Sequence, residues 1–426
     1  EVSSPVAIHY SHASVNADFA LTCPPRWRSV AAWEDNLGAL YAARDEWVAL
    51  LEDFGIRPRF VSSREIEDGE LERGKYKLLV LPRSVAVSDR EAAAMKKFVK
   101  AGGVLAADSF PGRMDEHCRD RNEGCLDRLM GVQRIEKDDY FCTTDDINWL
   151  GNWRGEKFPG RIRFDAGYVE NRIKPRGKAI AMGRTEVADS PIGIVNEAGQ
   201  GKTVLFNATP EGYMQGRSRA LGKTMRSFFG QCLEMAGVKP EVAVTREGEE
   251  SPLPGYGVFP FRHGSHCYYG LAPDLKFTQD ALGEIRTDVQ EGPRHVILTF
   301  PTAGHIYDVR KGQYLGKGKR VAVDLEAFAA PLYAVTKTKA RGMKLSMDGK
   351  KVSARLSVSG GKPGERVFRF DVLTKGGKRV VDAGANVVAR GGLATWTTDG
   401  TLPKNSRIVC RDVATGVQDE IAVKAE

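Results

Sequence analysis

The turn around Ser109 has the residue types and the position of a catalytic serine. The sequence GGVLAADSFPG, residues 102–112, reads as a short apolar strand that ends in an abrupt polar turn, which is where many α/β enzymes hold their nucleophile. Phe110 and Pro111 are bulky, however, where such a turn needs small residues. A serine nucleophile also needs a histidine base that a carboxylate positions, and the nearest histidine, His117, belongs to no motif. We therefore interpret the turn as a structural connection and keep a hydrolase that uses Ser109 as the alternative.

Two His-x-x-His pairs have a spacing that could serve a metal. They are His9 with His12 and His263 with His266, and Cys267 follows the second pair. On a strand, residues three apart point to opposite faces, and neither pair has a helical context. We therefore expect no metal site in this chain, and no motif calls for a cofactor.

The polar loop DDINWLGNWRG, residues 145–155, has the composition of a sugar-binding loop. Indole rings stack on the apolar faces of sugar rings while neighbouring polar side chains hydrogen-bond the hydroxyl groups. The carbohydrate-contact candidates are Trp149, Trp153, Arg154, Asp145 and Asp146. The alternative is that both tryptophans pack against their own domain or against a subunit interface.

The seven cysteines are dispersed and do not form a disulfide framework, although Cys118 and Cys125 could pair if their loop folds back. No apolar run is long enough to cross a bilayer, so we expect no membrane span. The chain begins at Glu1 without a methionine, which favours a processed protein or a fragment. A secreted or periplasmic bacterial location and a cytoplasmic one both fit, so the compartment stays open.

The net charge of +8 comes from the C-terminal end. Residues 337–426 hold 18 Lys and Arg against 9 Asp and Glu, densest in DGKKVSAR and TKGGKR. This basic module is either a solvated surface or a docking face for an anionic polymer. Nucleic acid is the less attractive partner, because the aromatic residues are scattered and no nucleic-acid motif is present. An anionic polysaccharide is the partner that we prefer.

The first 240 residues alternate strands and helices, which predicts an α/β domain with a parallel, doubly wound sheet. VAIHY (residues 6–10) reads as a strand and residues 33–55 as a long amphipathic helix. A capping box, Ser88 with Glu91, opens another helix. GQGK (residues 199–202) lies between two alternating strands, so we interpret it as a hairpin turn and not as a phosphate loop.

Helical signals vanish after about Val242, and short strands follow at the spacing of β-sandwiches. A second all-β unit of about ninety residues begins beyond Lys339 and has the turn glycines of an immunoglobulin-like sandwich. We predict an α/β domain at 1–240, a small β-sandwich at 241–337 and a basic immunoglobulin-like β-sandwich at 338–426.

The order of these features resembles the middle, trimerisation domain and the following small β domain of family 42 β-galactosidases and related glycoside hydrolases. The segments that carry the resemblance are residues 32–62 and 76–116, GCLDRLMGVQRIE (124–136), PIGIVNEAGQGKTVLFNATP (191–210) and GHIYDVRKGQYLG (304–316). Together they place the resemblance along roughly residues 6–335.

The resemblance implies a class I glutamine-amidotransferase-like, flavodoxin-like fold without amidotransferase activity, and a homo-oligomer that is a trimer in the family. The family's catalytic glutamates lie on a TIM barrel N-terminal to this domain, and no position of this sequence matches them. The resemblance therefore implies an upstream or separate catalytic barrel as partner.

Three functions follow as hypotheses. The first is a non-catalytic portion of a multidomain glycoside hydrolase, which assembles the protein and shapes its substrate pocket. The second is a stand-alone hydrolase that uses Ser109 in the α/β domain. The third is a glycan-binding or scaffold protein. The sugar, its linkage and the parent enzyme's activity are left open by the sequence.

Overall fold

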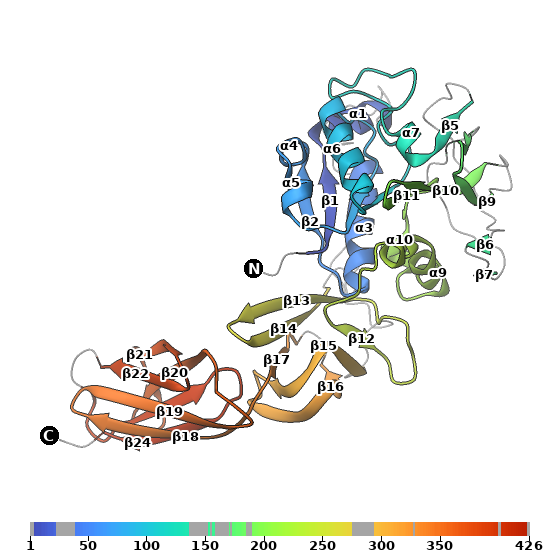
Figure 1. Cartoon of the computed structure of the whole chain (residues 1–426). Helices are drawn as coiled ribbons and strands as arrows, with labels where there is room; N and C mark the ends of the chain where they lie inside the picture. Colours follow the sequence, from blue (N-terminus) through green and yellow to red (C-terminus); the bar gives the residue numbers. More distant parts are fainter. Residues whose placement is uncertain are drawn as a thin grey trace, which may run out of the picture. The chain divides into compact units, whose positions relative to one another are not determined.

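The computed structural model describes residues 4–22, 39–135, 152–153, 156–157, 170, 173–184, 190–274, 294–326, 329–398 and 402–423. The chain divides into two compact units, Ser3–Pro240 and Glu241–Glu426. Each unit is described by itself (Figure 1).

A seven-stranded sheet forms the centre of the first unit. Its order is β2-β1-β3-β4-β11-β10-β9, in which the first five strands run parallel and the last two pairings are antiparallel. The strands are β1 (Val6–Tyr10), β2 (Arg59–Ser62), β3 (Leu78–Leu81), β4 (Val104–Ala107), β9 (Ile180–Arg184), β10 (Pro191–Ala198) and β11 (Gly201–Phe206). The mixed α/β character predicted from the sequence is confirmed.

Helices pack on both faces of this sheet, because its central strands are apolar at successive positions and alternate side chains reach opposite faces. Val6 and Ile8 of β1 belong to one buried cluster and Ala7 to the other. The helices are α1 (His12–Thr22), α3 (Ala39–Asp53), α4 (Ser63–Glu67), α5 (Glu70–Arg73), α6 (Asp89–Lys100), α7 (Asp127–Met130), α8 (Tyr213–Gly216), α9 (Ala220–Phe229) and α10 (Gln231–Met235). Two small two-stranded sheets complete the unit: β5 (Val132–Arg134) with β8 (Ile173–Pro175), and β6 (Asn152–Trp153) with β7 (Glu156–Lys157).

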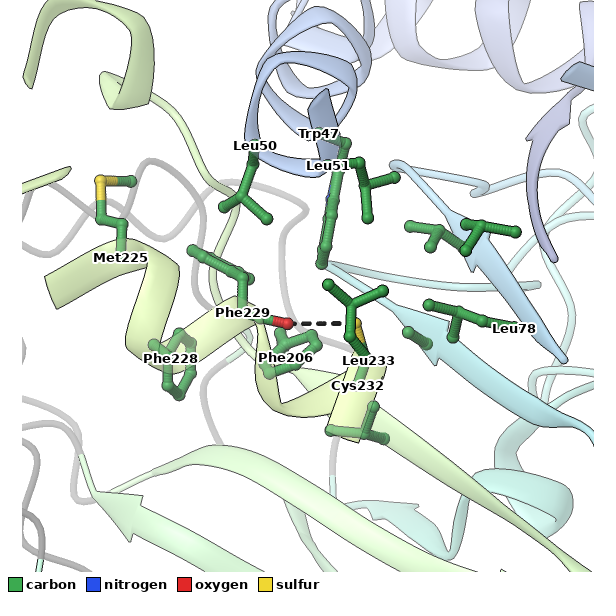
Figure 2. Close-up of a cluster of buried hydrophobic side chains, with 14 of the residues drawn as sticks. Trp47, Leu50, Leu51, Leu78, Phe206, Met225, Phe228, Phe229, Cys232 and Leu233 are labelled. Carbon is green, nitrogen blue, oxygen red and sulfur yellow. Dashed lines mark hydrogen bonds between the residues drawn. The ribbon is translucent and has the colours of Figure 1, made fainter. Parts of the chain in front are cut away.

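The first cluster is dominated by aromatic side chains (Figure 2). Phe206 of β11 lies with its ring centre 5.8 Å from that of Trp47, 5.0 Å from that of Phe228 and 5.1 Å from that of Phe229. Such aromatic pairs add about 0.5–1.5 kcal/mol each beyond the area they bury. This cluster fixes α3, α9 and α10 on one face of the sheet.

Local sequence signals gave two features correctly. Ser88 accepts a hydrogen bond from the Glu91 amide at 3.1 Å, and Glu91 accepts one from the Ser88 amide at 2.8 Å, which confirms the predicted capping box. GQGK is the hairpin between β10 and β11, with Ala198 paired to Gly201 and with φ of 68° at Gly199.

Among its described residues the second unit begins with one six-stranded sheet, whereas a sandwich of two stacked sheets was predicted for 241–337. The order is β12-β15-β17-β14-β13, and β16 pairs with β15. The strands are β12 (Ala243–Thr245), β13 (Tyr256–His263), β14 (His266–Pro273), β15 (Arg294–Asp308), β16 (Gln313–Leu325) and β17 (Leu332–Thr336). A register shift between Thr299 and Gly304 divides β15, so that β12 pairs with its first half and β17 with its second. Bulges bend a sheet, and this one encloses its own apolar cluster.

Two antiparallel sheets make up the C-terminal part. One has the order β18-β19-β22 and the other β21-β20-β23-β24. The strands are β18 (Lys339–Asp348), β19 (Lys351–Ser359), β20 (Arg366–Leu373), β21 (Arg379–Ala389), β22 (Leu393–Thr397), β23 (Arg407–Asp412) and β24 (Gln418–Ala422). Val352 of the first sheet and Phe368 and Phe370 of the second belong to one buried cluster, so the two sheets form a sandwich.

The two β parts of this unit are in direct contact. Tyr307, Ala334 and Ala414 form a shared buried cluster. Two turn glycines also meet, because a Cβ built on Gly416 would lie 2.5 Å from the Cα of Gly312. No helix among the described residues is long and apolar enough to cross a membrane.

Candidate functional site at the carboxyl edge of the parallel sheet

The carboxyl ends of the parallel strands are where an open α/β sheet holds its ligands. Here the polar residues at this edge are His9 at the end of β1, Ser63 after β2, Arg83 and Ser84 after β3, Asp108 and Ser109 after β4, and Asn207 after β11. The strand order brings them together from distant parts of the sequence. The edge is therefore the candidate functional site of the first unit.

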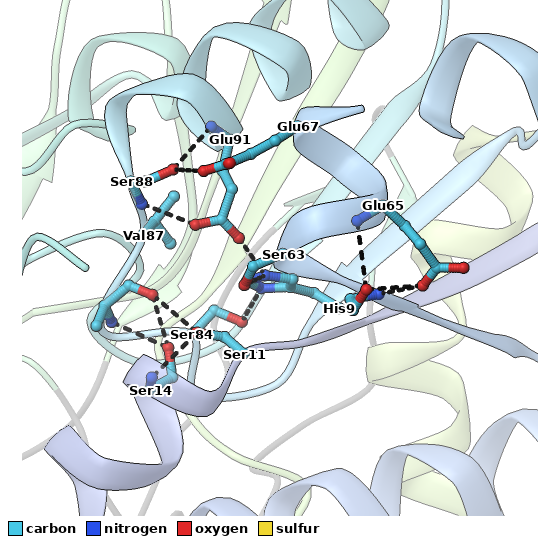
Figure 3. Close-up of polar contacts among 12 residues, drawn as sticks. His9, Ser11, Ser14, Ser63, Glu65, Glu67, Ser84, Val87, Ser88 and Glu91 are labelled. Carbon is cyan, nitrogen blue, oxygen red and sulfur yellow. Dashed lines mark hydrogen bonds and ion pairs between the residues drawn. The ribbon is translucent and has the colours of Figure 1, made fainter. Parts of the chain in front are cut away.

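His9 is the centre of a buried polar cluster (Figure 3). Its Nδ1 lies 2.9 Å from the Ser84 hydroxyl, and its Nε2 lies 2.8 Å from Glu91 Oε1. Burial alone raises the pKa of Glu91, but the hydrogen bond and charge of His9, together with the Ser88 amide and the Ser63 hydroxyl, lower it to about 2. The carboxylate is therefore ionised, and His9 Nε2 donates to it.

Ser84, His9 and Glu91 thus have the order of contacts of a serine–histidine–carboxylate triad. A nucleophile must reach its substrate, whereas Ser84 is 1% exposed and His9 3% exposed. The arrangement joins β1, the segment after β3 and α6, and it satisfies groups that would otherwise be buried without partners.

Asp108 is held by groups from two other elements. Trp47 Nε1 of α3 donates to its Oδ2 at 2.8 Å, and the backbone amide of Arg83 donates to its Oδ1. Burial raises the pKa of Asp108 to about 7, against the lowering effect of these two donors. The Arg83 guanidinium in turn lies 2.6 Å from Asp18 of α1 and donates to it. The residues after β3 and β4 are therefore tied to α1 and α3.

The residue kept as the alternative nucleophile lies inside this arrangement. Ser109 is fully buried, at 0% exposure. Phe110 has the positive φ, 60°, and its amide donates to Glu170 at 2.9 Å. His117 lies on an exposed turn beside Glu116, at 3.9 Å. The histidine at the carboxyl edge is thus His9, which the sequence singled out only for its spacing from His12.

Glu170 anchors a further set of contacts. Arg134 donates to both of its carboxylate oxygens, at 2.5 and 2.9 Å, and also pairs with Asp127. The side chain of Asn207 accepts from the Glu170 amide at 2.7 Å and donates to its carbonyl oxygen at 2.8 Å. The described polar groups around the Ser109 turn are therefore bonded to other parts of the chain.

The two His-x-x-His pairs have different structures. His9 is buried and His12 is exposed, as expected for side chains that diverge. In the second pair the strand breaks, because Gly264 and Ser265 form a turn and His263 pairs with His266 across the β13–β14 hairpin, so these two residues do not lie three apart on one strand. His266 Nε2 bonds the Pro363 carbonyl at 3.2 Å, and His263 Nε2 lies 3.3 Å from Glu365. The described residues hold no group of three or more His, Cys, Asp or Glu side chains suited to a metal.

Of the carbohydrate-contact candidates, Trp149, Arg154, Asp145 and Asp146 lie outside the described residues, and Trp153 is described only as backbone in β6. Cys118 and Cys125 are free thiols. The Cys118 thiol donates to the Ala13 carbonyl at 3.4 Å, and the Cys125 thiol lies 3.8 Å from the Val87 carbonyl.

No family model and no curated protein matches the sequence. Solved structures do share the fold. The β-galactosidase from Bacillus circulans sp. alkalophilus is 16% identical with a TM-score of 0.53, and the match covers 78% of this chain and 42% of that one. Gan42B, a family 42 β-galactosidase from G. stearothermophilus, is 17% identical with a TM-score of 0.51, covering 79% and 41%. The β-galactosidase from Rahnella sp. R3 is 17% identical with a TM-score of 0.51, and the match covers 78% of this chain and 41% of that one. The chain therefore has the fold of about two fifths of the length of these β-galactosidases.

Proposed function

We propose that this chain is the non-catalytic assembly and pocket-shaping portion of a glycoside hydrolase related to the family 42 β-galactosidases. The shared fold supports the link to carbohydrate. The parallel order β2-β1-β3-β4-β11 supports the amidotransferase-like, flavodoxin-like class for residues 1–240. The three- and four-stranded sheets support an immunoglobulin-like domain at 338–426, with 241–337 as the small β domain between them.

The observation that carries the non-catalytic part is the state of the carboxyl edge. Glu91 bonds His9, Asp18 bonds Arg83 and Asp108 bonds Trp47. Each of these six residues is at most 3% exposed. A ligand site presents its polar groups to a cavity, whereas this edge uses them to join helices to the sheet. It works as a scaffold.

The proposal also assigns catalysis, assembly and sugar contact. The acid and nucleophile of the hydrolase lie on a separate TIM barrel, and the chain assembles as a homo-oligomer, with a trimer as the expected form. Trp149 and Trp153, with Asp145, Asp146 and Arg154, line the substrate pocket and contact the sugar. Substitution of both tryptophans by alanine is then expected to weaken glycan affinity.

Three measurements on the purified chain test this function. We expect no hydrolysis of 4-nitrophenyl β-galactoside, no labelling by a fluorophosphonate probe, and a light-scattering mass well above the 46.7 kDa of one chain, with that of a trimer as the expected form. We expect neither hydrolysis nor labelling because Ser84 and Ser109 are buried.

The variants Ser84→Ala and Ser109→Ala provide the matched comparison. Labelling or turnover that disappears in one of them identifies the chain as a hydrolase and overturns the proposal. A monomer at all concentrations contradicts the assembly role, and glycan affinity in such a monomer favours a binding protein instead.

A further inference from the structure

A pocket of about 720 Å³ lies within the second unit, between the β13–β14 hairpin and the four-stranded sheet of the C-terminal sandwich. The sequence singled out two of its lining residues, His263 and Arg379, but not the pocket itself, and the carboxyl edge of the first unit has no part in it. Its lining includes Phe261, Tyr268, Arg369, Asp371, Arg379 and Arg411. One wall is aromatic and the other is rich in arginine.

The arginine wall follows from the register of the sheet. Phe368 and Phe370 of β20 point into the sandwich core, so Arg369 between them points outward. Arg369 pairs with Arg411 of β23 on one side and with Asn386 of β21 on the other. Side chains of directly paired residues on adjacent strands have Cβ atoms roughly 5 Å apart. Three polar side chains therefore form a row across the outer face.

Charge on this wall is not balanced. Asp371 accepts from Arg369 at 2.9 Å and lies 2.7 Å from Arg379, and the same Oδ1 serves both. Arg411 has no carboxylate within ion-pair distance among the described residues, and it stands opposite Arg369. Like charges that face each other across strands are unfavourable. An anion between Arg369 and Arg411 would relieve this repulsion with charge-assisted hydrogen bonds.

The facing wall supplies an apolar platform. Phe261 and Tyr268 pair directly across the hairpin. Phe261 is 55% exposed although it is a large apolar side chain. Tyr268 lines the same pocket and carries a phenolic hydroxyl that can donate a hydrogen bond. An aromatic face beside a hydrogen-bond donor suits the apolar face and the hydroxyl groups of a sugar ring.

We propose that this pocket binds an anionic oligosaccharide, with a carboxylate or sulfate group between Arg369 and Arg411 and a sugar ring against Phe261. The choice of carbohydrate over nucleic acid rests on the proposed function. Two sources of the same anionic chemistry, uronate residues and sulfate esters, fit the arginine pair equally well. Nucleic acid remains an outcome of the test, since a single exposed aromatic ring is less than the series of stacking side chains that single strands need.

The test is binding of the whole chain to four labelled probes by fluorescence anisotropy at fixed ionic strength. The probes are an oligogalacturonate hexamer with carboxylates only, a heparin hexasaccharide with sulfates as well, a neutral maltohexaose and a dT12 strand. We expect saturable binding of the heparin probe, of the oligogalacturonate, or of both, weaker binding of dT12, and none of maltohexaose. Binding of heparin alone assigns the anion as sulfate, and binding of both shows that a carboxylate is sufficient.

Variants locate the binding in the pocket. Arg411→Gln is expected to weaken affinity roughly tenfold or more, the effect of losing one hydrogen bond to a charged group, and Phe261→Ala roughly fivefold. Arg355→Gln is the matched control, because Arg355 is an exposed arginine on the other sheet of the sandwich, in the DGKKVSAR cluster. It should change affinity less than about twofold. Unchanged thermal midpoints show that the variants are folded.

Other results overturn the proposal. The first is that neither anionic sugar binds saturably, and the second is that Arg355→Gln and Arg411→Gln lose equal affinity. The third is that maltohexaose binds and that Arg411→Gln does not change its affinity. The fourth is that dT12 binds at least as tightly as the anionic sugars. Light scattering and β-galactoside turnover on the same samples distinguish a failure of the pocket proposal from a failure of the proposed function. Arg411→Gln that loses the sugar while assembly persists supports the pocket, whereas failure of assembly alone bears on the proposed function.

Discussion

His9 and His266 are both buried histidines, but they have different partners. His9 lies 2.8 Å from the ionised Glu91. His266 is 1% exposed and bonds the Pro363 carbonyl. Burial, followed by the charge of Arg366 and the smaller effects of His263 and Lys337, lowers the pKa of His266 from 6.5 to about 4, against the raising effect of the Pro363 carbonyl. His266 is therefore neutral in the folded protein at physiological pH.

This makes the second unit sensitive to acid. Below pH 6.5 the unfolded chain protonates His266, while the folded chain does so only near pH 4. The free energy of unfolding therefore falls over this window, by about 3 kcal/mol at most. His266→Gln removes the proton uptake, so the variant should lose less stability than the wild type between pH 7.5 and pH 4. Urea unfolding at several pH values measures the difference, and parallel pH profiles would contradict the assignment.

At the scale of elements, signals confined to a few neighbouring residues were predictable. The Ser88–Glu91 capping box and the hairpin at 199–202 each depend on adjacent residues, and both are present. Helix α1 was missed because its apolar residues do not gather on one face. The His9–Ser84–Glu91 contacts were also missed, since only the parallel pairing of β1 with β3 brings these positions together.

The β10–β11 hairpin gives a prediction at this scale. A Cβ on Gly201 would lie 2.2 Å from the carbonyl oxygens of Val99 and Gly103, which are backbone atoms that cannot move aside. Gly201→Ala should therefore reduce the free energy of unfolding by about 3 kcal/mol. Gly177→Ala is the control, because Gly177 has a positive φ of 64° but no described atom within 4 Å of its Cβ position. It should lose only about 1 kcal/mol. Chemical unfolding compares them, and equal losses would refute the steric explanation.

At the scale of the whole molecule, the described apolar cores are separate. The aromatic cluster around Phe206 lies within the first unit, and the cluster around Phe370 lies within the C-terminal sandwich. The basic C-terminal end and the loss of helical signals near Val242 were visible in the sequence. The continuous six-stranded sheet was not, because nothing local marks the register shift in β15.

Separate cores predict separate unfolding transitions. Phe206→Ala should lower one calorimetric midpoint by about 10 °C, from a loss of about 3–5 kcal/mol, and leave the other unchanged. Phe370→Ala should have the reverse effect. If both substitutions shift a single common transition, the two units unfold cooperatively and the prediction is wrong.

The contact between Gly312 and Gly416 has a practical consequence for engineering the protein. Hairpin turns are usually chosen for inserted epitopes or fluorescent labels, because exposed loop tips tolerate added residues. These two turns are unsuitable, since a Cβ on Gly416 would lie 2.5 Å from the Cα of Gly312, and a Cβ on Gly312 would already touch the Cα of Gly416 at 3.5 Å. The turn at Gly349 joins β18 to β19 and has no described atom within 4 Å of its Cβ position. A label belongs there, where it reports on the sandwich without separating it from the sheet before it.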